Sequence, residues 1–269
     1  MLEGLRQRVL TAMALAPALI AAVVFLPPPL FSLMLALLLI PASLEMGALA
    51  GLDQLRQRRL YAAAIALLML AIALLPRWQP AVLAAAAGAW LPLAAWLAWP
   101  GEGAQPAPWG RPAKLAAGVV IITGCWLALS LAEAQSPGHT LALLAVIWAA
   151  DAGAYFTGKA IGHHPLAPRL SPGKTFEGLA GGLFAAALVA ILLIRLAEGR
   201  LPSPGWVVLI AVGIAAISVA GDLFVSLLKR QAGVKDSGGL LPGHGGLLDR
   251  IDSLAAAAPF YTLAVLAGR

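Results

Sequence analysis

The two kinds of sequence from which this chain is built meet in residues 206–253, WVVLIAVGIAAISVAGDLFVSLLKRQAGVKDSGGLLPGHGGLLDRIDS. The first part, 206–228, is an apolar run long enough to cross a bilayer as a helix, and it is interrupted by one acid, Asp222. The second part gathers basic, acidic and glycine residues. Most of the remaining chain is Ala, Leu, Val and Ile, so charge is concentrated where we expect the working part of the protein.

The composition indicates a membrane protein. The 269 residues are 61% hydrophobic and only 11% charged, whereas a soluble domain has about 25% charged residues. Repeated apolar runs predict an all-α, polytopic integral membrane protein with about nine transmembrane helices. The predicted runs are 9–26, 30–51, 60–76, 81–99, 115–134, 139–159, 176–197, 206–228 and 251–267. The first is interpreted as a retained helix and not as a signal peptide.

The polar gaps between these runs are too short for a soluble domain, so we predict one membrane domain over 1–269. An N-terminal helical part spans about 1–135, and a catalytic part spans about 136–269. Cys125 is the single cysteine, which excludes a disulfide framework and a thiolate metal cluster.

Basic residues predict the orientation. With the N-terminus in the cytoplasm, the inner segments hold every Lys and Arg except Arg77, Arg195, Arg200 and Arg269. This positive-inside bias explains the net charge of +6 more simply than a nucleic-acid partner does. It places the polar loops 160–175 and 229–250 on the cytoplasmic face of a multi-pass protein. The alanine-rich composition and the single-chain form favour the inner (plasma) membrane of a bacterium.

Several acids lie within or beside the apolar runs. Glu45, Asp151 and Asp222 lie inside runs, and Glu177 and Asp252 lie in the first turns of others. All five fall in the predicted cytoplasmic half. Ionised groups at such depths usually face a polar cavity or a partner, which makes each a functional candidate. The alternative for each, strongest for Glu45, is a structural ion pair.

Asp222 and Asp249 form a candidate metal pair. Asp222 ends one predicted helix and Asp249 precedes the next, so the loop between them can bring both carboxylates to one site. Two carboxylates without cysteine favour Mg²⁺, with water or phosphate oxygens as the other ligands. Two such ions would stabilise the attacking and leaving oxygens of a phosphoryl or nucleotidyl transfer.

The loop between these acids could bind phosphate. Lys229, Arg230 and Lys235 supply positive charge, although cations here also complement a helix dipole or bind lipid headgroups. The glycines at 238–246 expose backbone N–H groups that can cradle an anion, and His244 could donate to a phosphate. A solvated histidine is the simpler alternative.

Residues 171–177, SPGKTFE, form a second candidate. The segment is not a Walker A loop, because Pro168 stands where the first glycine is required. Ser171 and Lys174 nevertheless precede an outward-going helix, whose positive end attracts anions. Thr175 and Glu177 could instead be capping and first-turn residues.

In the preceding predicted helix, Asp151 and Tyr155 are four residues apart and share one face, so both side chains could point into the same polar cavity.

These residues together resemble the signature of the phosphatidate cytidylyltransferase (CDP-diglyceride synthetase) family. The resemblance is dense over about 148–253 and thin over the first half. It rests on Ser226-x-x-Lys229-Arg230-x-x-x-x-Lys235-Asp236, Pro242-Gly243-His244-Gly245-Gly246, Asp249-Arg250-x-Asp252-Ser253, Asp151-x-x-Ala154-Tyr155 and Ser171-Pro172-x-Lys174-Thr175-x-Glu177-Gly178.

The resemblance implies that CTP and phosphatidic acid give CDP-diacylglycerol and pyrophosphate, with Mg²⁺. It implies metal ligation by Asp222 and Asp249, and a substrate site that includes Ser226, Lys229, Arg230 and Lys235. Val225 stands where the family commonly has Glu, which puts one contact near the metal in doubt.

The full set of candidates follows from the residues and the resemblance together. Asp222, Asp249, Lys229, Arg230 and Lys235 are predicted to be catalytic, with both acids as metal ligands. The predicted substrate-binding residues are Ser171, Lys174, Thr175, Glu177, Ser226, Asp236, His244, Gly245, Gly246, Arg250, Asp252, Asp151 and Tyr155.

Three other functions compete. An ion-coupled secondary transporter would explain the intramembrane acids but not the basic, glycine-rich loop, and no inverted repeat is evident. An enzyme that consumes a CDP-lipid would need a D-G-x-x-A-R motif, which is absent. A cytidylyltransferase for another lipid phosphate stays open. The number of metal ions (one or two), an additional monovalent cation and a homodimer also stay open.

Overall fold

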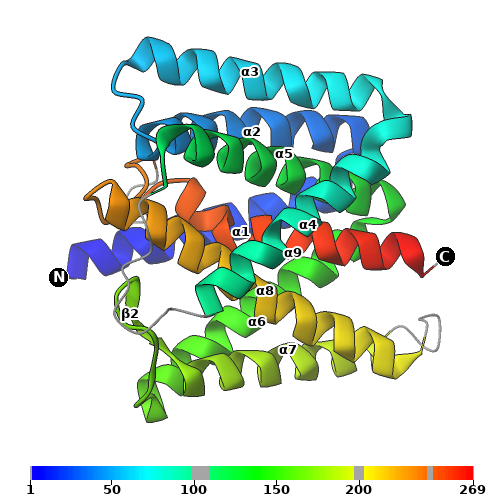
Figure 1. The fold of residues 1–269 in the computed structure, drawn as a ribbon. Coiled ribbons are helices and arrows are strands. Elements are labelled where there is room, and N and C mark those ends of the chain that lie inside the picture. The colour runs from blue at the N-terminus through cyan, green and yellow to red at the C-terminus, as the bar shows by residue number, and fades with distance from the viewer. Residues whose placement is uncertain (1, 99–108, 197–202, 241–244, 269) are drawn as a thin grey trace.

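The computed structural model describes residues 2–98, 109–196, 203–240 and 245–268. These residues form a bundle of α-helices with one short β-hairpin at one end (Figure 1). The elements are α1 (Leu2–Phe25), α2 (Pro28–Leu49), α3 (Leu55–Leu74), the 3-10 turn η1 (Pro76–Trp78), α4 (Gln79–Ala98), α5 (Arg111–Gln135), α6 (Pro137–Ile161), β1 (Pro165–Ala167), β2 (Ser171–Thr175), α7 (Phe176–Leu196), α8 (Pro204–Gln231) and α9 (Leu248–Ala267).

The helices coincide with the predicted apolar runs and begin a few residues earlier. Proline stands in the first turn of α2, α5, α6 and α8. Its missing N–H costs nothing there, and its fixed φ suits a helix start. These prolines therefore mark where α2, α5, α6 and α8 begin.

Six of the helices, α2, α3, α5, α6, α7 and α8, are long and apolar enough to cross a bilayer. The fold is that of an all-α membrane protein, as predicted, but a count of about nine spans is not confirmed. The described part of α1, α4 and α9 does not meet the same criterion of length and composition.

The hairpin was not expected. β1 and β2 pair antiparallel, with Pro165 opposite Thr175 and Ala167 opposite Ser171. Its strands are too short, and too rich in proline and glycine, to give a strand pattern in the sequence. It makes the link between α6 and α7 an ordered element.

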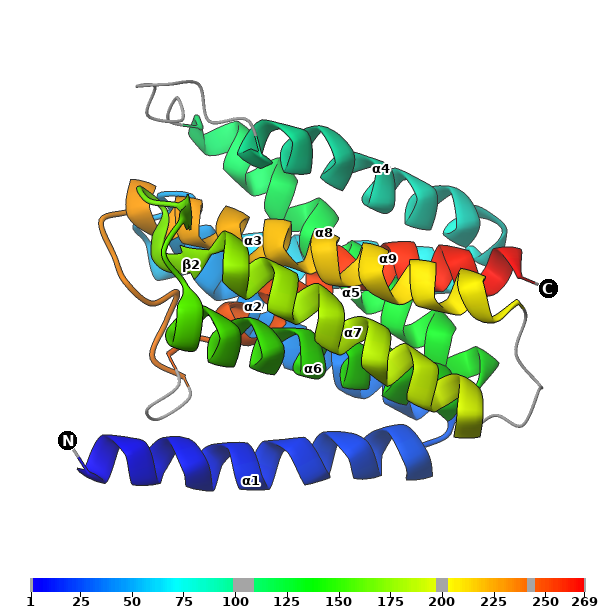
Figure 2. The same ribbon diagram turned by 90° about the horizontal axis from the view of Figure 1, so that it is seen from below.

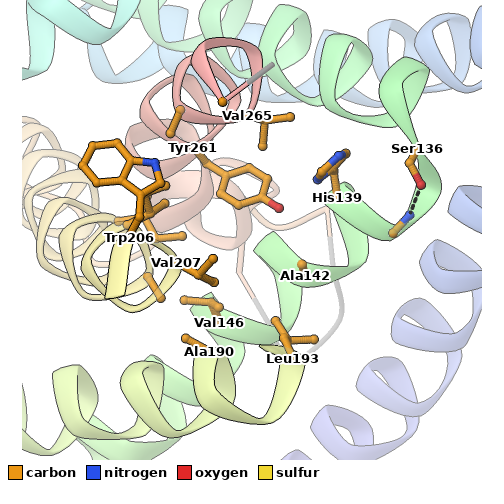
Figure 3. A pocket seen from close by; sticks show the side chains of 16 residues that line it. Ser136, His139, Ala142, Val146, Ala190, Leu193, Trp206, Val207, Tyr261 and Val265 are labelled. Carbon is orange, nitrogen blue, oxygen red and sulfur yellow. Dashed lines mark hydrogen bonds between the residues drawn. The ribbon is translucent and has the colours of Figure 1, made fainter. Parts of the chain in front are cut away.

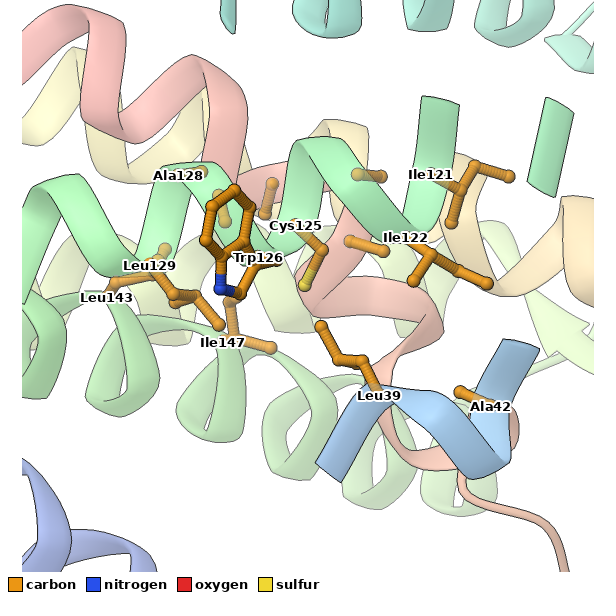
Figure 4. Close-up of a cluster of buried hydrophobic side chains, with 14 of the residues drawn as sticks. Leu39, Ala42, Ile121, Ile122, Cys125, Trp126, Ala128, Leu129, Leu143 and Ile147 are labelled. Carbon is orange, nitrogen blue, oxygen red and sulfur yellow. The ribbon is translucent and has the colours of Figure 1, made fainter. Parts of the chain in front are cut away.

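The core lies around α5, which packs against α2, α9, α6 and α4. Figure 4 shows Ile122, Cys125 and Trp126 of α5 facing buried side chains of α2 and α6. The indole N–H of Trp126 donates to the backbone oxygen of Ser32 at 3.0 Å. Large apolar side chains such as Leu67 remain exposed on the outside, as expected for helices whose solvent is lipid.

The polar segments gather at one end of the bundle. The hairpin and the loop before α9 lie at the end where α1 begins, and α9 finishes at the other end (Figure 2). The guanidinium Nε of Arg230 donates to the backbone oxygen of Leu170, which ties α8 to the hairpin at 3.4 Å. The two loops that were predicted to share one membrane face therefore lie together.

Candidate active site

Asp222 forms an ion pair with Lys174. Asp222 lies on α8, nine residues before its last residue, Gln231, and Lys174 lies on β2, so the hairpin carries its lysine to the side of the helix. Both side chains are partly exposed, 34% for Asp222 and 24% for Lys174. An exposed pair of this kind can exchange partners, because solvent compensates each charge when the contact opens.

Two further carboxylates lie within electrostatic reach of this pair. Asp151 on α6 interacts with Asp222, Lys174 and Arg250. Asp252 on α9 is buried, and it interacts with Asp222 and Lys174. Three helices and the hairpin thus bring together an acid cluster, which we define as Asp151, Asp222 and Asp252, with Lys174 as its nearby cation.

Gly221 makes this convergence possible. A Cβ at this position would collide with the backbone oxygen of Asp252 and contact Ala256. Without a side chain there, α8 and α9 approach closely, as small residues allow in membrane helix pairs. The next residue, Asp222, is thereby held beside Asp252.

Asp249 is held more tightly than Asp222. Its Oδ1 lies 2.6 Å from Lys229 Nζ, and these side chains are only 6% and 13% exposed. Its Oδ2 accepts from the backbone N–H groups of Ser237, at 2.8 Å, and Gly246, at 3.2 Å. Burial alone would raise the pKa of Asp249, but the bonds to Lys229, Ser237 and Gly246 lower that pKa below its ordinary value.

Glu45 holds the start of α9. Its carboxylate on α2 accepts from the backbone N–H of Leu247, at 3.0 Å, and of Leu248, at 2.8 Å. The first N–H groups of a helix have no partner within the helix, so this acid acts as a cap from a distant element. A Cβ at Gly238 or at Gly246 would collide with the same carboxylate.

Asp222, Ser226 and Lys229 lie on one face of α8, since they are spaced i, i+4 and i+7. Ser226 is buried. Three of the predicted site residues of α8 thus form one stripe, which ends at the ion pair between Lys229 and Asp249.

Several predicted substrate residues have structural contacts. The Thr175 hydroxyl accepts from the Gly178 N–H at 3.0 Å and caps α7. Glu177 Oε1 lies 2.5 Å from His164 Nδ1. These contacts agree with the capping alternative for Thr175 and the first-turn alternative for Glu177. Ser171 begins β2, three residues before Lys174.

Tyr155 lies apart from these contacts. Its side chain is 62% exposed, packs edge-on against Phe156 and lies under the ammonium of Lys159. Asp151 and Tyr155 share a helix, but the contacts of Tyr155 are with its neighbours on α6.

The remaining predicted residues lie around the loop. Lys235, Asp236 and Arg250 are exposed. Gly245 has a φ of +79°, a conformation that favours glycine, and faces Asp236 and Asp249. His244 lies outside the described residues.

Two cavities in the described part of the bundle are large enough for part of a substrate. One, of about 550 Å³, is lined by Asp151, Asp249, Arg250 and Asp252 at one end and by apolar side chains elsewhere. The other, of about 440 Å³, lies near the opposite end of the bundle and is drawn in Figure 3. Among the described residues, its lining includes no Asp, Glu, Lys or Arg; His139 packs edge-on against Tyr261 there. Only the first cavity has charges that could act on a phosphate.

The acid cluster fits a hard divalent cation shared with a ligand. Its donors are carboxylate oxygens, which Mg²⁺ prefers. In the described residues, no three His, Cys, Asp or Glu side chains are arranged to hold a metal by themselves. A metal at Asp222 would thus need further oxygens from water or from substrate phosphates, as is usual for Mg²⁺.

The sequence matches the model of the cytidylyltransferase family over residues 6–267. The chain belongs to this family. It is 41% identical over 260 residues to the phosphatidate cytidylyltransferase of Pseudomonas aeruginosa, covering 96% of this chain and 95% of that protein. It is 49% identical over 136 residues to the Haemophilus influenzae protein of the same name, covering 48% and 47% of the two chains. For the Bacillus subtilis protein of that name, identity is 47% over 116 residues, covering 43% and 42%.

The sequence did not point to Ser237, which the structure places between the carboxylates of Glu45 and Asp249. Its hydroxyl lies 2.9 Å from Glu45 Oε2 and 3.0 Å from Asp249 Oδ2. The one signal was its position, directly after Lys235-Asp236 and directly before the glycines. Glu45 was recognised only as an intramembrane acid, because nothing in its own surroundings points to a loop that lies far along the chain.

Proposed function

We propose that this protein transfers the cytidylyl group of CTP to phosphatidic acid, giving CDP-diacylglycerol and pyrophosphate in phospholipid biosynthesis. The single observation that carries the proposal is that Asp252, which interacts with Asp222 and Lys174, lines the charged end of a largely apolar cavity. The relatives named phosphatidate cytidylyltransferase, one of them aligned over nearly the whole chain, support the choice of substrates.

In the reaction, an oxygen of the lipid phosphate attacks the α-phosphorus of CTP. A new P–O bond forms, and the bond from that phosphorus to the oxygen bridging to the β-phosphate breaks. The electron pair of the broken bond leaves with pyrophosphate. The lipid phosphate is already anionic near neutral pH, so no proton has to be removed from the nucleophile. Catalysis therefore depends on positioning and charge neutralisation.

The basic residues supply this neutralisation. We assign Lys229, Arg230 and Lys235 to the phosphates of CTP, and Lys174 and Arg250 to the meeting point of nucleotide and lipid. Lys174 neutralises Asp222 in the structure. We propose that it turns to a substrate phosphate when CTP arrives, because the partly exposed pair opens at little cost.

Asp222 and Asp249 are proposed to hold Mg²⁺, as one ion or two, with a monovalent cation as an addition. When bound, the metal supplies positive charge beside the α-phosphate and the leaving pyrophosphate. Asp222 has one ion-pair partner to release. Asp249 already has donors on both oxygens, so its share in a metal site requires Lys229 to move to the substrate.

We further propose that the site faces the cytoplasm, in the inner membrane of a bacterium, with the N-terminus on the same side. The basic loops at the hairpin end support this orientation through the positive-inside rule. CTP would come from the cytoplasm, and the lipid would enter sideways from the bilayer. A homodimer stays a prediction that cross-linking in membranes tests.

The test is pyrophosphate release by the purified protein with Mg²⁺, CTP and phosphatidic acid. We expect equal amounts of pyrophosphate and CDP-diacylglycerol, and no release without the lipid. Solute uptake into vesicles without nucleotide turnover would instead support the transporter. Faster turnover with an ether-linked lipid phosphate than with the diacyl form would indicate that the ether-linked lipid phosphate is the preferred substrate.

A further inference from the structure

The cavity that contains the charged residues continues far into the bundle. Its wall is formed by α1 on one side and by α2, α5, α6 and α9 on the other. Figure 2 shows α1 running alongside the rest of the bundle as its own outer layer. The space of about 550 Å³ thus lies between one helix and the body of the protein.

The two ends of this cavity differ in chemistry. At one end α9 and α6 contribute Asp249, Arg250, Asp252 and Asp151. Beyond them the lining is almost entirely apolar. It includes Leu19 of α1 and Phe31 of α2. A ligand that fills the whole cavity therefore has a charged head and a long apolar body.

The length of the cavity matches one leaflet of a bilayer. Asp151 and Thr140 both line it, and they are eleven residues apart on α6. At 1.5 Å per residue this separation is about 16 Å. Half of a hydrocarbon core is about 15 Å. Asp151 lies near the middle of α6 and Thr140 in its first turn, so the apolar part runs from the middle of the bundle towards the end opposite the hairpin.

From these observations we infer that this cavity is the acyl-chain site of the lipid substrate, with α1 as its outer wall. The inference rests on the proposed function. The phosphate of phosphatidic acid lies near Arg250 and the acid cluster, and the acyl chains lie along α1, α2 and α6. Lipid chains are favoured over a helix of a partner protein because α1 already covers this face, so an occupant enters between α1 and the bundle.

A matched pair of α1 variants tests the inference. Ala22 lines the cavity, whereas its exposed neighbour Ala21 is not part of the lining. Ala22→Trp should fill part of the cavity and raise the KM for a long-chain phosphatidic acid by about tenfold. A change of that size follows if two methylene groups of the acyl chain are no longer buried in the cavity. The KM for CTP and the turnover of dihexanoyl phosphatidic acid should stay as in the wild type. Ala21→Trp should leave all of these values unchanged.

The outcomes separate the two proposals. If the wild-type protein releases no pyrophosphate with either lipid, the proposed function fails. If it is active but Ala22→Trp has the same KM for the long-chain lipid as Ala21→Trp, the acyl-chain site is wrong while the function stands.

A second measurement uses the wild-type protein, so it does not depend on a variant that folds. A long-chain phosphatidic acid with a diazirine at the end of one chain is photolysed with the protein in detergent. We expect labelling in 15–22 of α1 and 31–39 of α2, suppressed by unlabelled phosphatidic acid. Equal labelling of the exposed faces of α3 and α7, without competition, would overturn the inference.

Discussion

The hydroxyl of Ser237 donates to Glu45 across 2.9 Å, although the two residues are 192 positions apart in the chain. The same hydroxyl oxygen lies 3.0 Å from Asp249 Oδ2. One hydroxyl proton is therefore shared between an acid of α2 and an acid of α9. This contact joins the N-terminal half, where the resemblance to the family is thin, to the loop that carries the signature.

Glu45→Ala should loosen the loop before α9. The substitution removes the acceptor of the Leu247 and Leu248 N–H groups and of Ser237. An unsatisfied buried donor costs about 1–3 kcal/mol, so we expect a lower melting temperature and faster proteolysis between 232 and 248. Pyrophosphate release should fall with it.

The control for this variant is Asp53→Ala, at an exposed acid in the turn after α2. It should have the stability of the wild type. A Glu45→Ala protein with normal proteolysis and normal turnover would show that the α2–α9 contact has no part in organising the site.

Asp222→Asn and Asp249→Asn should fail in different ways. The Asp222 pair is partly exposed, so its loss should leave stability nearly unchanged while pyrophosphate release falls about 100-fold. Asp249 is nearly buried with Lys229. Removing one partner of a buried pair costs about 3–5 kcal/mol, so the Asp249 variant should also melt early.

Thermal unfolding and turnover measured on the same preparations check this contrast. Near wild-type turnover in either variant would contradict the assignment of both acids to the catalytic site.

Gly221→Ala should reduce both stability and activity. The added Cβ collides with the backbone of α9 at Asp252, and backbone cannot move aside as a side chain can. The separation of Asp222 and Asp252 would then change. Melting temperature and the KM for CTP measure the two effects.

The matched control lies on the same helix. A Cβ at Gly213 meets nothing within 4 Å, so Gly213→Ala should stabilise α8 by about 0.5–1 kcal/mol through helix propensity. Equal destabilisation by both substitutions would mean that α8 and α9 do not depend on the close approach at Gly221.

Removal of divalent metal should abolish pyrophosphate release. We expect EDTA to stop the reaction and added Mg²⁺ to restore it, because the acid cluster repels substrate phosphates without a bridging cation. Full activity in EDTA would contradict the metal assignment. The Asp222→Asn protein should require a higher Mg²⁺ concentration than the wild type for half-maximal release.

The bundle could be predicted from the sequence because its signals are local. Apolar runs bounded by prolines such as Pro28, Pro137 and Pro204 mark helices directly. The loop that joins α8 and α9 predicted that Asp222 and Asp249 reach one site, and in the structure both acids interact with Asp252. The family resemblance placed Lys174 with them, although the sequence between α6 and α7 gave no sign of the hairpin that presents it.

The rest depends on contacts between distant segments. Glu45 has no neighbour in sequence that would indicate a cap for α9, and Ser237 is an ordinary loop serine until both acids are seen around it. The number of membrane spans could not be predicted reliably from the residue pattern alone. α9 coincides with a predicted apolar run, but Asp249, Arg250 and Asp252 lower the hydropathy of its first turns.

The carboxylate of Glu45 occupies a slot that exists only because positions 238 and 246 lack side chains. A side chain at 238 or 246 would displace the Glu45 carboxylate, and at 246 also the Ser237 hydroxyl. The carboxylate would then lose its hydrogen bonds to Leu247, Leu248 and Ser237, which couples changes at the three positions. Across the family we expect positions 45, 238 and 246 to vary together. Sequence changes in the first half of the protein would then be coupled to changes in the loop before α9.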